Sequence, residues 1–210
     1  MPKRRYFLAL VFVLFFSFTC CYGPGLMPDS NIQDTDSEEL KKAKSKMIAY
    51  YHEADPFGDK VEFIAYTPKD IRAGGLVFWP RIEDTKQGVF LFVVAKYRGR
   101  LWMFLQMIRI VADGKIYNLP IDNKYRHTHI YDTGVEEEVY ILFSDRCDLA
   151  RSLCLPLDAF KDMTRAQSAT VRFVGDRHHY DLKFSDKHKK GFQDSLDFIR
   201  LMMIERGKAR

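Results

Sequence analysis

The middle of this 210-residue chain is built from segments rich in β-branched and aromatic residues, with short turns and few helical patterns between them. Such segments are typical of strands. They span residues 61–67, 76–82, 89–97, 101–111, 115–121, 135–143, 170–174 and 178–184. Asp113-Gly114, between two of them, is the strongest two-residue hairpin signal. Because turns rather than crossover helices join these strands, the sequence predicts a mainly β, antiparallel two-sheet β-sandwich of about eight to ten strands.

The segment 101–111 is apolar in both of its alternating sets of side chains. A strand that is apolar on both faces should be central in its sheet and covered on each side. Trp102 in this segment is therefore predicted to be a core residue, whereas Trp79, which precedes Pro80, is the better candidate for exposure.

Helical patterns flank the strands. Residues 38–53 are rich in Lys, Ala and Glu, with Asp36 or Ser37 as N-cap, and Ser185 caps a second predicted helix over 186–206. One face of this second helix is predicted to be apolar and buried, with the residues Phe192, Leu196, Ile199 and Met203. The two helices give the sandwich α+β character at its ends. One further segment, near 145–163, is predicted to leave the strand pattern between them.

The N-terminus has the order of a bacterial export signal. Lys3, Arg4 and Arg5 precede an unbroken apolar run over 7–16 and then two cysteines. The predicted organisation is an export signal over 1–21, a flexible tether over 22–37 and one globular domain over 38–210. A permanent anchor is the alternative, although a spanning helix needs about 20 apolar residues and the run is shorter.

Cys20 and Cys21 resemble the lipobox of bacterial lipoproteins, in which a cysteine after the apolar run receives diacylglycerol. The residues Ser17, Phe18 and Thr19 depart from the usual pattern of a leucine and a small residue. The resemblance implies a lipid anchor on Cys20 or Cys21 and hence the membrane as a partner. A periplasmic or freely secreted product remains the alternative.

Net charge excludes one class of partner. Three of the five net positive charges lie in the predicted signal, at Lys3, Arg4 and Arg5, which leaves two for the rest of the chain. A nearly balanced domain gives no electrostatic reason to expect nucleic acid binding.

Two cysteines remain, Cys147 and Cys154. Residues 144–155 have a helical pattern capped by Ser144, and seven residues along a helix rise about 10.5 Å, beyond the roughly 7 Å that a disulfide allows between Cα atoms. We therefore expect free thiols, with a bridge and a broken helix as the alternative.

Four histidines form the candidate metal site. His127 and His129 are two residues apart, so on a strand they would point the same way, as paired ligands do. His178 and His179 begin another predicted strand, where one of the two could join them. Zinc or copper suits such a set, and plain surface histidines are the alternative.

Catalytic signals are missing. The chain has no G-x-S-x-G, Walker A or G-x-G-x-x-G motif. The acidic run over 136–138 is predicted to lie on a solvated or edge strand, with Glu136 and Glu138 on one face and Glu137 on the other. The sequence favours a non-enzymatic, exported binding or structural module of the cell envelope, with a protein or glycan partner. A metal-binding protein and a hydrolase with scattered site residues are the alternatives.

One local pattern has a family resemblance. YRGRLWMF followed by ADGKIY, within 97–117, resembles a pattern of uncharacterised secreted or lipid-anchored bacterial β-sandwich domains. The resemblance covers one hairpin and implies a fold but no activity.

Overall fold

The computed structural model of the chain describes residues 25–26, 33, 35–52, 63–69, 75–145 and 153–208. The predicted signal with Cys20 and Cys21, most of the predicted tether, and Cys147 lie outside the described residues. Within the described part no helix is long and apolar enough to span a bilayer.

The larger sheet has eight strands. They are β1 (Gly25–Leu26), β2 (Met47–His52), β3 (Phe63–Pro68), β4 (Leu76–Asp84), β5 (Val89–Gly99), β8 (Arg126–Tyr131), β9 (Gly134–Phe143) and β10 (Cys154–Leu155). The order is β1-β2-β3-β4-β5-β9-β10, and β8 also pairs with β9. All pairs are antiparallel except β9 with β10.

The smaller sheet has four antiparallel strands in the order β12-β11-β6-β7. They are β6 (Met107–Ala112), β7 (Lys115–Pro120), β11 (Ala169–Val174) and β12 (His179–Lys183). Asp113 and Gly114 turn the chain between β6 and β7 with positive φ angles, as the hairpin signal predicts. The mainly β, two-sheet prediction is confirmed. The strands exceed the predicted number because two-residue strands such as β1 and β10 carry no periodic signal.

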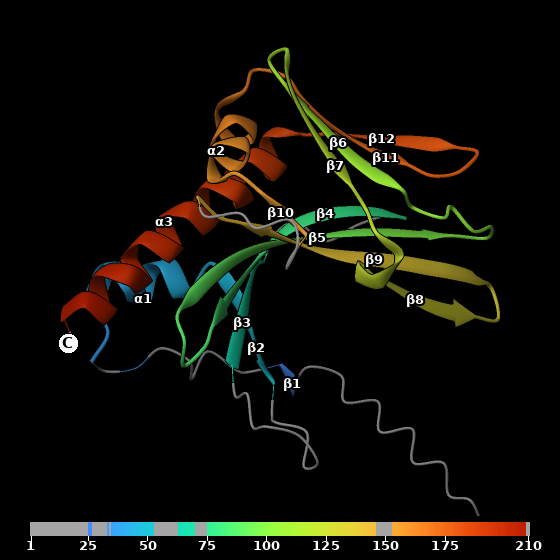
Figure 1. Cartoon of the computed structure of the whole chain (residues 1–210). Coiled ribbons are helices and arrows are strands. Elements are labelled where there is room, and N and C mark those ends of the chain that lie inside the picture. Colours follow the sequence, from blue (N-terminus) through green and yellow to red (C-terminus); the bar gives the residue numbers. More distant parts are fainter. Residues whose placement is uncertain are drawn as a thin grey trace, which may run out of the picture.

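Three α-helices gather on one side of the strands (Figure 1). They are α1 (Glu38–Lys44), α2 (Leu157–Arg165) and α3 (Asp186–Lys208). The long helix α3 packs against β3, β4 and β5 and contacts both other helices. A short 3₁₀ helix, Asn123–Tyr125, precedes β8.

A cluster of phenylalanine rings joins both sheets to the helices. Phe78 on β4 contacts Phe173 on β11 and Phe192 on α3, with ring centroids 6.4 and 6.0 Å apart. Phe160 on α2 stacks on Phe192 at 4.6 Å and meets Phe143 on β9 at 5.2 Å. Edge-to-face and offset ring contacts of this kind stabilise a core beyond the area they bury.

The predicted helix over 38–53 is only half correct. α1 ends at Lys44, and Met47–His52 forms β2, which pairs with β3 over its whole length. The residues IAYY favour a strand once a partner strand is present, and Met47 and Ala49 are buried in alternation.

The predicted two-faced strand over 101–111 is wrong in its first half. Only Met107–Ala112 is a strand, and residues 101–106 are irregular. Trp102 is 38% exposed instead of buried, whereas Trp79 on β4 packs against the core. The exposures predicted for the two tryptophans are thus reversed.

The predicted C-terminal helix is confirmed, but the face that it buries differs from the predicted one. Phe192, Ser195, Phe198 and Met202 are buried, and Met203 is 56% exposed. Leu196 and Ile199 lie at the edge of this face, partly buried.

The expectation of free thiols is wrong for Cys154. This residue lies in β10 rather than in a helix, and it is disulfide-bonded. The parallel pairing of β10 with β9 overrides the helical pattern of 144–155 at its C-terminal end.

The acidic run is also not on a solvated edge. Glu136 and Glu138 are 8% exposed and Glu137 is fully buried. Because β9 lies between β5 on one side and β8 and β10 on the other, it has no free edge over these residues. The predicted alternation of the three side chains is correct.

Candidate functional site

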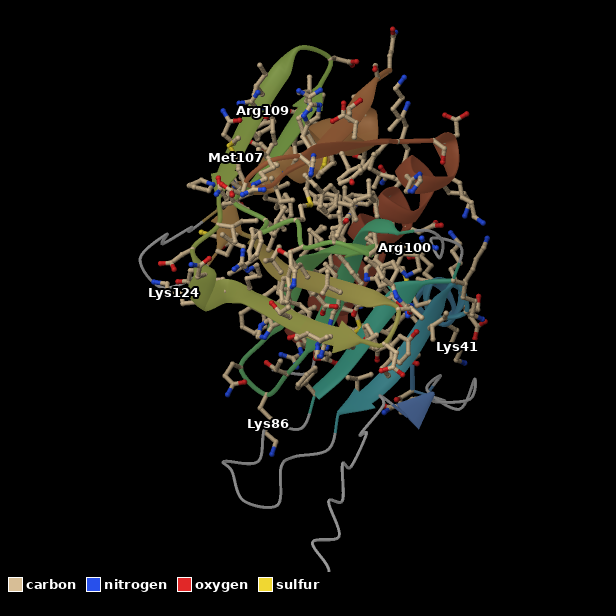
Figure 2. The ribbon with its side chains drawn as sticks, turned by 90° about the vertical axis from the view of Figure 1, so that its right-hand side faces the viewer. Lys41, Lys86, Arg100, Met107, Arg109 and Lys124 are labelled. Carbon is tan, nitrogen blue, oxygen red and sulfur yellow. The ribbon has the colours of Figure 1, made fainter. Side chains whose placement is uncertain are left out.

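A group of large apolar side chains is exposed at the end of the molecule remote from the helices. It comprises Leu101, Trp102, Phe104, Ile130, Tyr131 and Tyr180, which we call the apolar tip. Ile130 lies on the Glu137 face of the larger sheet and Tyr131 on the opposite face, because successive residues of β8 alternate. The residues of the apolar tip come from the segment after β5, from the β8–β9 hairpin and from the start of β12. The three turns lie at the right-hand edge of Figure 1, and Figure 2 looks onto this end, with Arg100 labelled in the turn after β5. Exposed apolar residues that cluster in this way are typical of a binding surface.

Direct contacts hold the three turns together. The Tyr97 hydroxyl donates to the carbonyl of Leu101 at 3.2 Å, and the Tyr97 ring stacks on Tyr180 at 5.4 Å. At the β8–β9 turn, a Cβ on Gly134 would lie 2.3 Å from the carbonyl oxygen of Gly99. The backbones of two turns therefore approach so closely that only glycine fits.

Two aromatic rings of the apolar tip stack on each other. Trp102 and Phe104 stack with centroids 5.5 Å apart and planes within 13°. The Arg126 guanidinium lies over the Phe104 ring at 5.8 Å, and Arg98 lies over Tyr131 at 4.9 Å. Arginine above an aromatic ring stabilises both side chains and presents a cation beside an apolar surface.

A buried carboxylate fixes the backbone that carries these rings. Glu137 accepts the consecutive backbone N–H groups of Met103, Phe104 and Leu105, each at 2.8 Å. Arg126 lies 3.8 Å from the same carboxylate. Successive N–H groups that converge on one anion form a nest, and here the anion is a side chain of the protein itself. We call this arrangement the Glu137 clasp.

The Glu137 clasp explains why the rings face outward. Met103 and Leu105 point into the core at 2% and 1% exposure, so Trp102 and Phe104 point away from it. Because the N–H groups of residues 103–105 bond to Glu137, they cannot enter a strand ladder. This is the physical reason why the predicted strand begins only at Met107.

The same segment links the two sheets. Gln106 donates its N–H to Val174 on β11 at 2.8 Å, and Asp176 donates its N–H to the Met103 carbonyl at 3.1 Å. A Cβ on Gly175 would lie 2.1 Å from that carbonyl oxygen. The segment is therefore clamped between β9 and β11.

A second group of polar residues lies on the face of the larger sheet opposite Glu137. Lys96 on β5 bridges Glu136 at 3.0 Å and Glu138 at 2.6 Å. Burial raises the pKa of Glu138, but the hydrogen bonds from Lys96 and Tyr140 outweigh it and the net pKa is lowered. Burial and the Glu138 hydrogen bond raise the pKa of Tyr140. All of these charges have partners, so the group is a closed network.

The predicted histidines divide between the two sheets. His127 and His129 lie on the same exposed face of β8, opposite Glu138 and Glu136 in register. His178 and His179 lie at the turn into β12 of the smaller sheet, also exposed. The described residues contain no group of three His, Cys, Asp or Glu side chains suited to a metal. The zinc or copper site stays a prediction. Of its four histidines, only His127 and His129 share one face of a strand.

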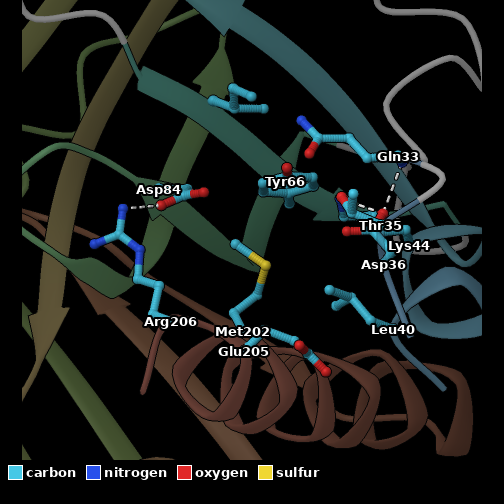
Figure 3. A pocket seen from close by; sticks show the side chains of 11 residues that line it. Gln33, Thr35, Asp36, Leu40, Lys44, Tyr66, Asp84, Met202, Glu205 and Arg206 are labelled. Atoms are coloured by element: carbon cyan, nitrogen blue, oxygen red, sulfur yellow. Dashed lines mark hydrogen bonds and ion pairs between the residues drawn. The ribbon is translucent and has the colours of Figure 1, made fainter. Parts of the chain in front are cut away.

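A pocket of about 360 Å³ lies between α1, α3 and strands β3 and β4 (Figure 3). Two ion pairs flank it: Asp36 with Lys44 at 2.7 Å, and Asp84 with Arg206 at 2.5 Å. Burial raises the pKa of Asp84 against the opposing effect of Arg206. Tyr66, Leu40 and Met202 line it between the pairs. Because the charged residues that flank this pocket are paired with each other, we interpret it as part of the packing between the helices and the larger sheet.

The sequence analysis did not predict the apolar tip, but the position of Glu137 in its strand is a signal that could have indicated the Glu137 clasp. Glu137 alternates with Val135, Val139 and Ile141 on the apolar face of its strand. A carboxylate at such a position needs hydrogen-bond donors from another segment, and the adjacent segment 101–106 supplies them.

Comparison of the chain with protein-family models, with curated proteins and with solved structures finds no match. The assignment of a function therefore depends on the geometry of the chain itself.

Proposed function

We propose that this chain is an exported protein of the cell envelope, without enzymatic activity, that binds a partner through the apolar tip. The observation that carries the proposal is the stacked Trp102–Phe104 pair, exposed to solvent and held by the Glu137 clasp. The two stacked rings still leave 38% and 46% of their surfaces in water, and a partner can bury this apolar area. Rings fixed before binding lose little conformational entropy when a partner covers them.

Export is supported by two independent features. The N-terminal 21 residues have the order of an export signal, and Cys154 is disulfide-bonded. Structural disulfides are typical of oxidising compartments outside the cytoplasm. We propose that Cys20 or Cys21 carries the lipid anchor, and the intact mass of the protein from its native membrane tests this directly.

Site-specific photo-cross-linking in living cells tests the binding surface. A benzoylphenylalanine at Leu101, which is 71% exposed in the apolar tip, is compared with one at Met203, which is 56% exposed on α3. We expect a discrete adduct with an envelope component from position 101 only. Equal adducts from both positions, or none from position 101, would contradict the proposal.

A further inference from the structure

We propose that the partner of the apolar tip is the surface of a phospholipid bilayer that contains anionic lipid. This inference rests on the proposed function, because it names the partner of the same surface. Its three components are exposed aliphatic side chains, amphipathic rings in the same turns, and arginines that can bind phosphate groups.

The aliphatic side chains stand at turns rather than in a groove. Leu101 is 71% exposed and Ile130 is 76% exposed, so neither lines a cavity. Leu101 follows the end of β5, and Ile130 is the penultimate residue of β8, next to the β8–β9 turn. Side chains at convex turns can enter the boundary between headgroups and acyl chains, about 5–10 Å deep, without any matching concave surface.

The rings beside them are mostly amphipathic. Trp102, Tyr131 and Tyr180 are each about 40% exposed, and each has an apolar body and a polar N–H or O–H. Tryptophan and tyrosine are enriched at the level of lipid headgroups for this reason. The Glu137 clasp holds Trp102 and its neighbour Phe104 in one orientation, so the surface needs no rearrangement before contact.

Charge selects anionic lipid. Arg98 and Arg100 are exposed near the turn after β5, and neither has an ion-pair partner among the described residues. Arg98 lies over Tyr131, on the face of the larger sheet opposite Glu137. Arg177, on the β11–β12 turn, is 86% exposed. Its Nε atom lies 4.0 Å from a carboxylate oxygen of Asp176, at the outer limit of an ion pair. The planar guanidinium group binds phosphate oxygens through paired hydrogen bonds. These arginines therefore complement the phosphates of an anionic bilayer.

The chain offers a direct spectroscopic test because it has only two tryptophans. In the full chain with Trp79→Phe, Trp102 is the sole tryptophan. We expect vesicles of phosphatidylglycerol and phosphatidylcholine to shift its emission to shorter wavelength, and brominated acyl chains in these vesicles to quench it. Quenching reports insertion of the apolar tip itself, whether or not a lipid anchor is also present. The same signal should disappear from a Trp102→Phe variant that retains Trp79, which covers the case in which Trp79→Phe does not fold.

Matched variants separate the apolar and charged contributions. Ile130→Asp should weaken vesicle binding at least about tenfold, because an exposed aliphatic side chain loses its burial in the interface. Met203→Asp on α3, a similarly exposed apolar residue, should leave binding unchanged. Arg100→Gln should reduce binding to the anionic vesicles, whereas Lys86→Gln, in the exposed β4–β5 turn, should not.

The outcomes distinguish this inference from the proposed function. Quenching in anionic but not in pure phosphatidylcholine vesicles supports the inference. Equal quenching in both would overturn the choice of anionic lipid. Absence of quenching, together with a protein adduct from position 101 in cells, would overturn the membrane partner but leave the binding module standing. Absence of both the quenching and the adduct from position 101 would contradict both the membrane partner and the binding role of the apolar tip.

Discussion

The carboxylate of Glu137 accepts the backbone N–H of Phe104 at 2.8 Å, at a residue whose φ is +53°. A non-glycine residue in this left-handed region is strained by about 1 kcal/mol or more, and bulky side chains rarely adopt it. The three charge-assisted hydrogen bonds of the Glu137 clasp offset that strain. One buried side chain on β9 thus sets the orientation of the exposed rings on a different segment.

Removal of the charge at Glu137 should destabilise the protein. In Glu137→Gln the side chain keeps one acceptor oxygen, and its amide group faces N–H donors. We expect the free energy of unfolding in urea to fall by about 2–4 kcal/mol. Asp132→Asn, an exposed change in the adjacent hairpin turn, should alter it by less than about 0.5 kcal/mol. An effect of Glu137→Gln as small as that of the control would show that the Glu137 clasp contributes little.

A methyl group at Gly175 should displace the segment that carries the apolar tip. The new Cβ would lie 2.1 Å from the backbone oxygen of Met103, which cannot move without breaking the hydrogen bonds of that segment. Gly175→Ala should therefore lower the unfolding free energy by about 1–3 kcal/mol and change the Trp102 fluorescence. Gly207→Ala, where nothing lies within 4 Å of the new Cβ on α3, should be neutral or slightly stabilising. Equal effects of the two substitutions would contradict a rigid contact between Gly175 and Met103.

Loss of the Lys96 charge should change the response of stability to pH. The folded pKa of Glu138 is lowered, so its contribution is fully present above the ordinary value of 4.5 and is lost as the pH falls through the folded pKa. In Lys96→Met, Glu138 loses the cation and the hydrogen bond that lower its pKa, and it faces Glu136 without a positive charge between them, so its pKa rises.

We therefore expect Lys96→Met to lower the unfolding free energy by about 1–3 kcal/mol at pH 7, and by less near pH 5, where the carboxyls take up protons. Urea denaturation of both proteins across this range measures the difference. Lys115→Met, which breaks a more exposed pair with Asp162, is the control and should cost less than about 1 kcal/mol at either pH. A penalty for Lys96→Met that grows on acidification would refute the expected direction of the pH dependence.

The disulfide of Cys154 should contribute measurably to stability. We expect its partner to be Cys147, because the other two cysteines belong to the predicted export signal. Cys147→Ser, Cys154→Ser and the double variant should each lose about 2–3 kcal/mol, since each removes the same short loop closure. Alkylation in denaturant without reductant, followed by intact mass, checks the pairing. A protected Cys154 with an alkylated Cys147 would assign the bridge to Cys20 or Cys21.

Much of the fold is predictable from local pattern. The alternation of apolar residues and the turn signals locate most strands, and the Asp113-Gly114 turn and the C-terminal helix follow from short-range rules. The alternation of Glu136, Glu137 and Glu138 is correct for the same reason, because successive side chains on a strand must face opposite ways. These features depend on neighbours in the sequence, so the sequence alone is enough.

The candidate site depends on neighbours far apart in the chain. Whether residues 101–106 form a strand is decided by Glu137, more than thirty residues away, which captures their N–H groups. The exposure of Trp102 follows from that capture and is opposite to what its apolar surroundings in the sequence indicate.

The sequence by itself determined that the chain is mainly β, that its N-terminus resembles an export signal, and that no common catalytic motif is present. The tertiary structure decided which apolar residues are covered, that Cys154 is bridged, and where the acidic run lies. Burial is a property of the assembled sheets and helices, and one buried carboxylate with three backbone donors was enough to turn a predicted core segment outward.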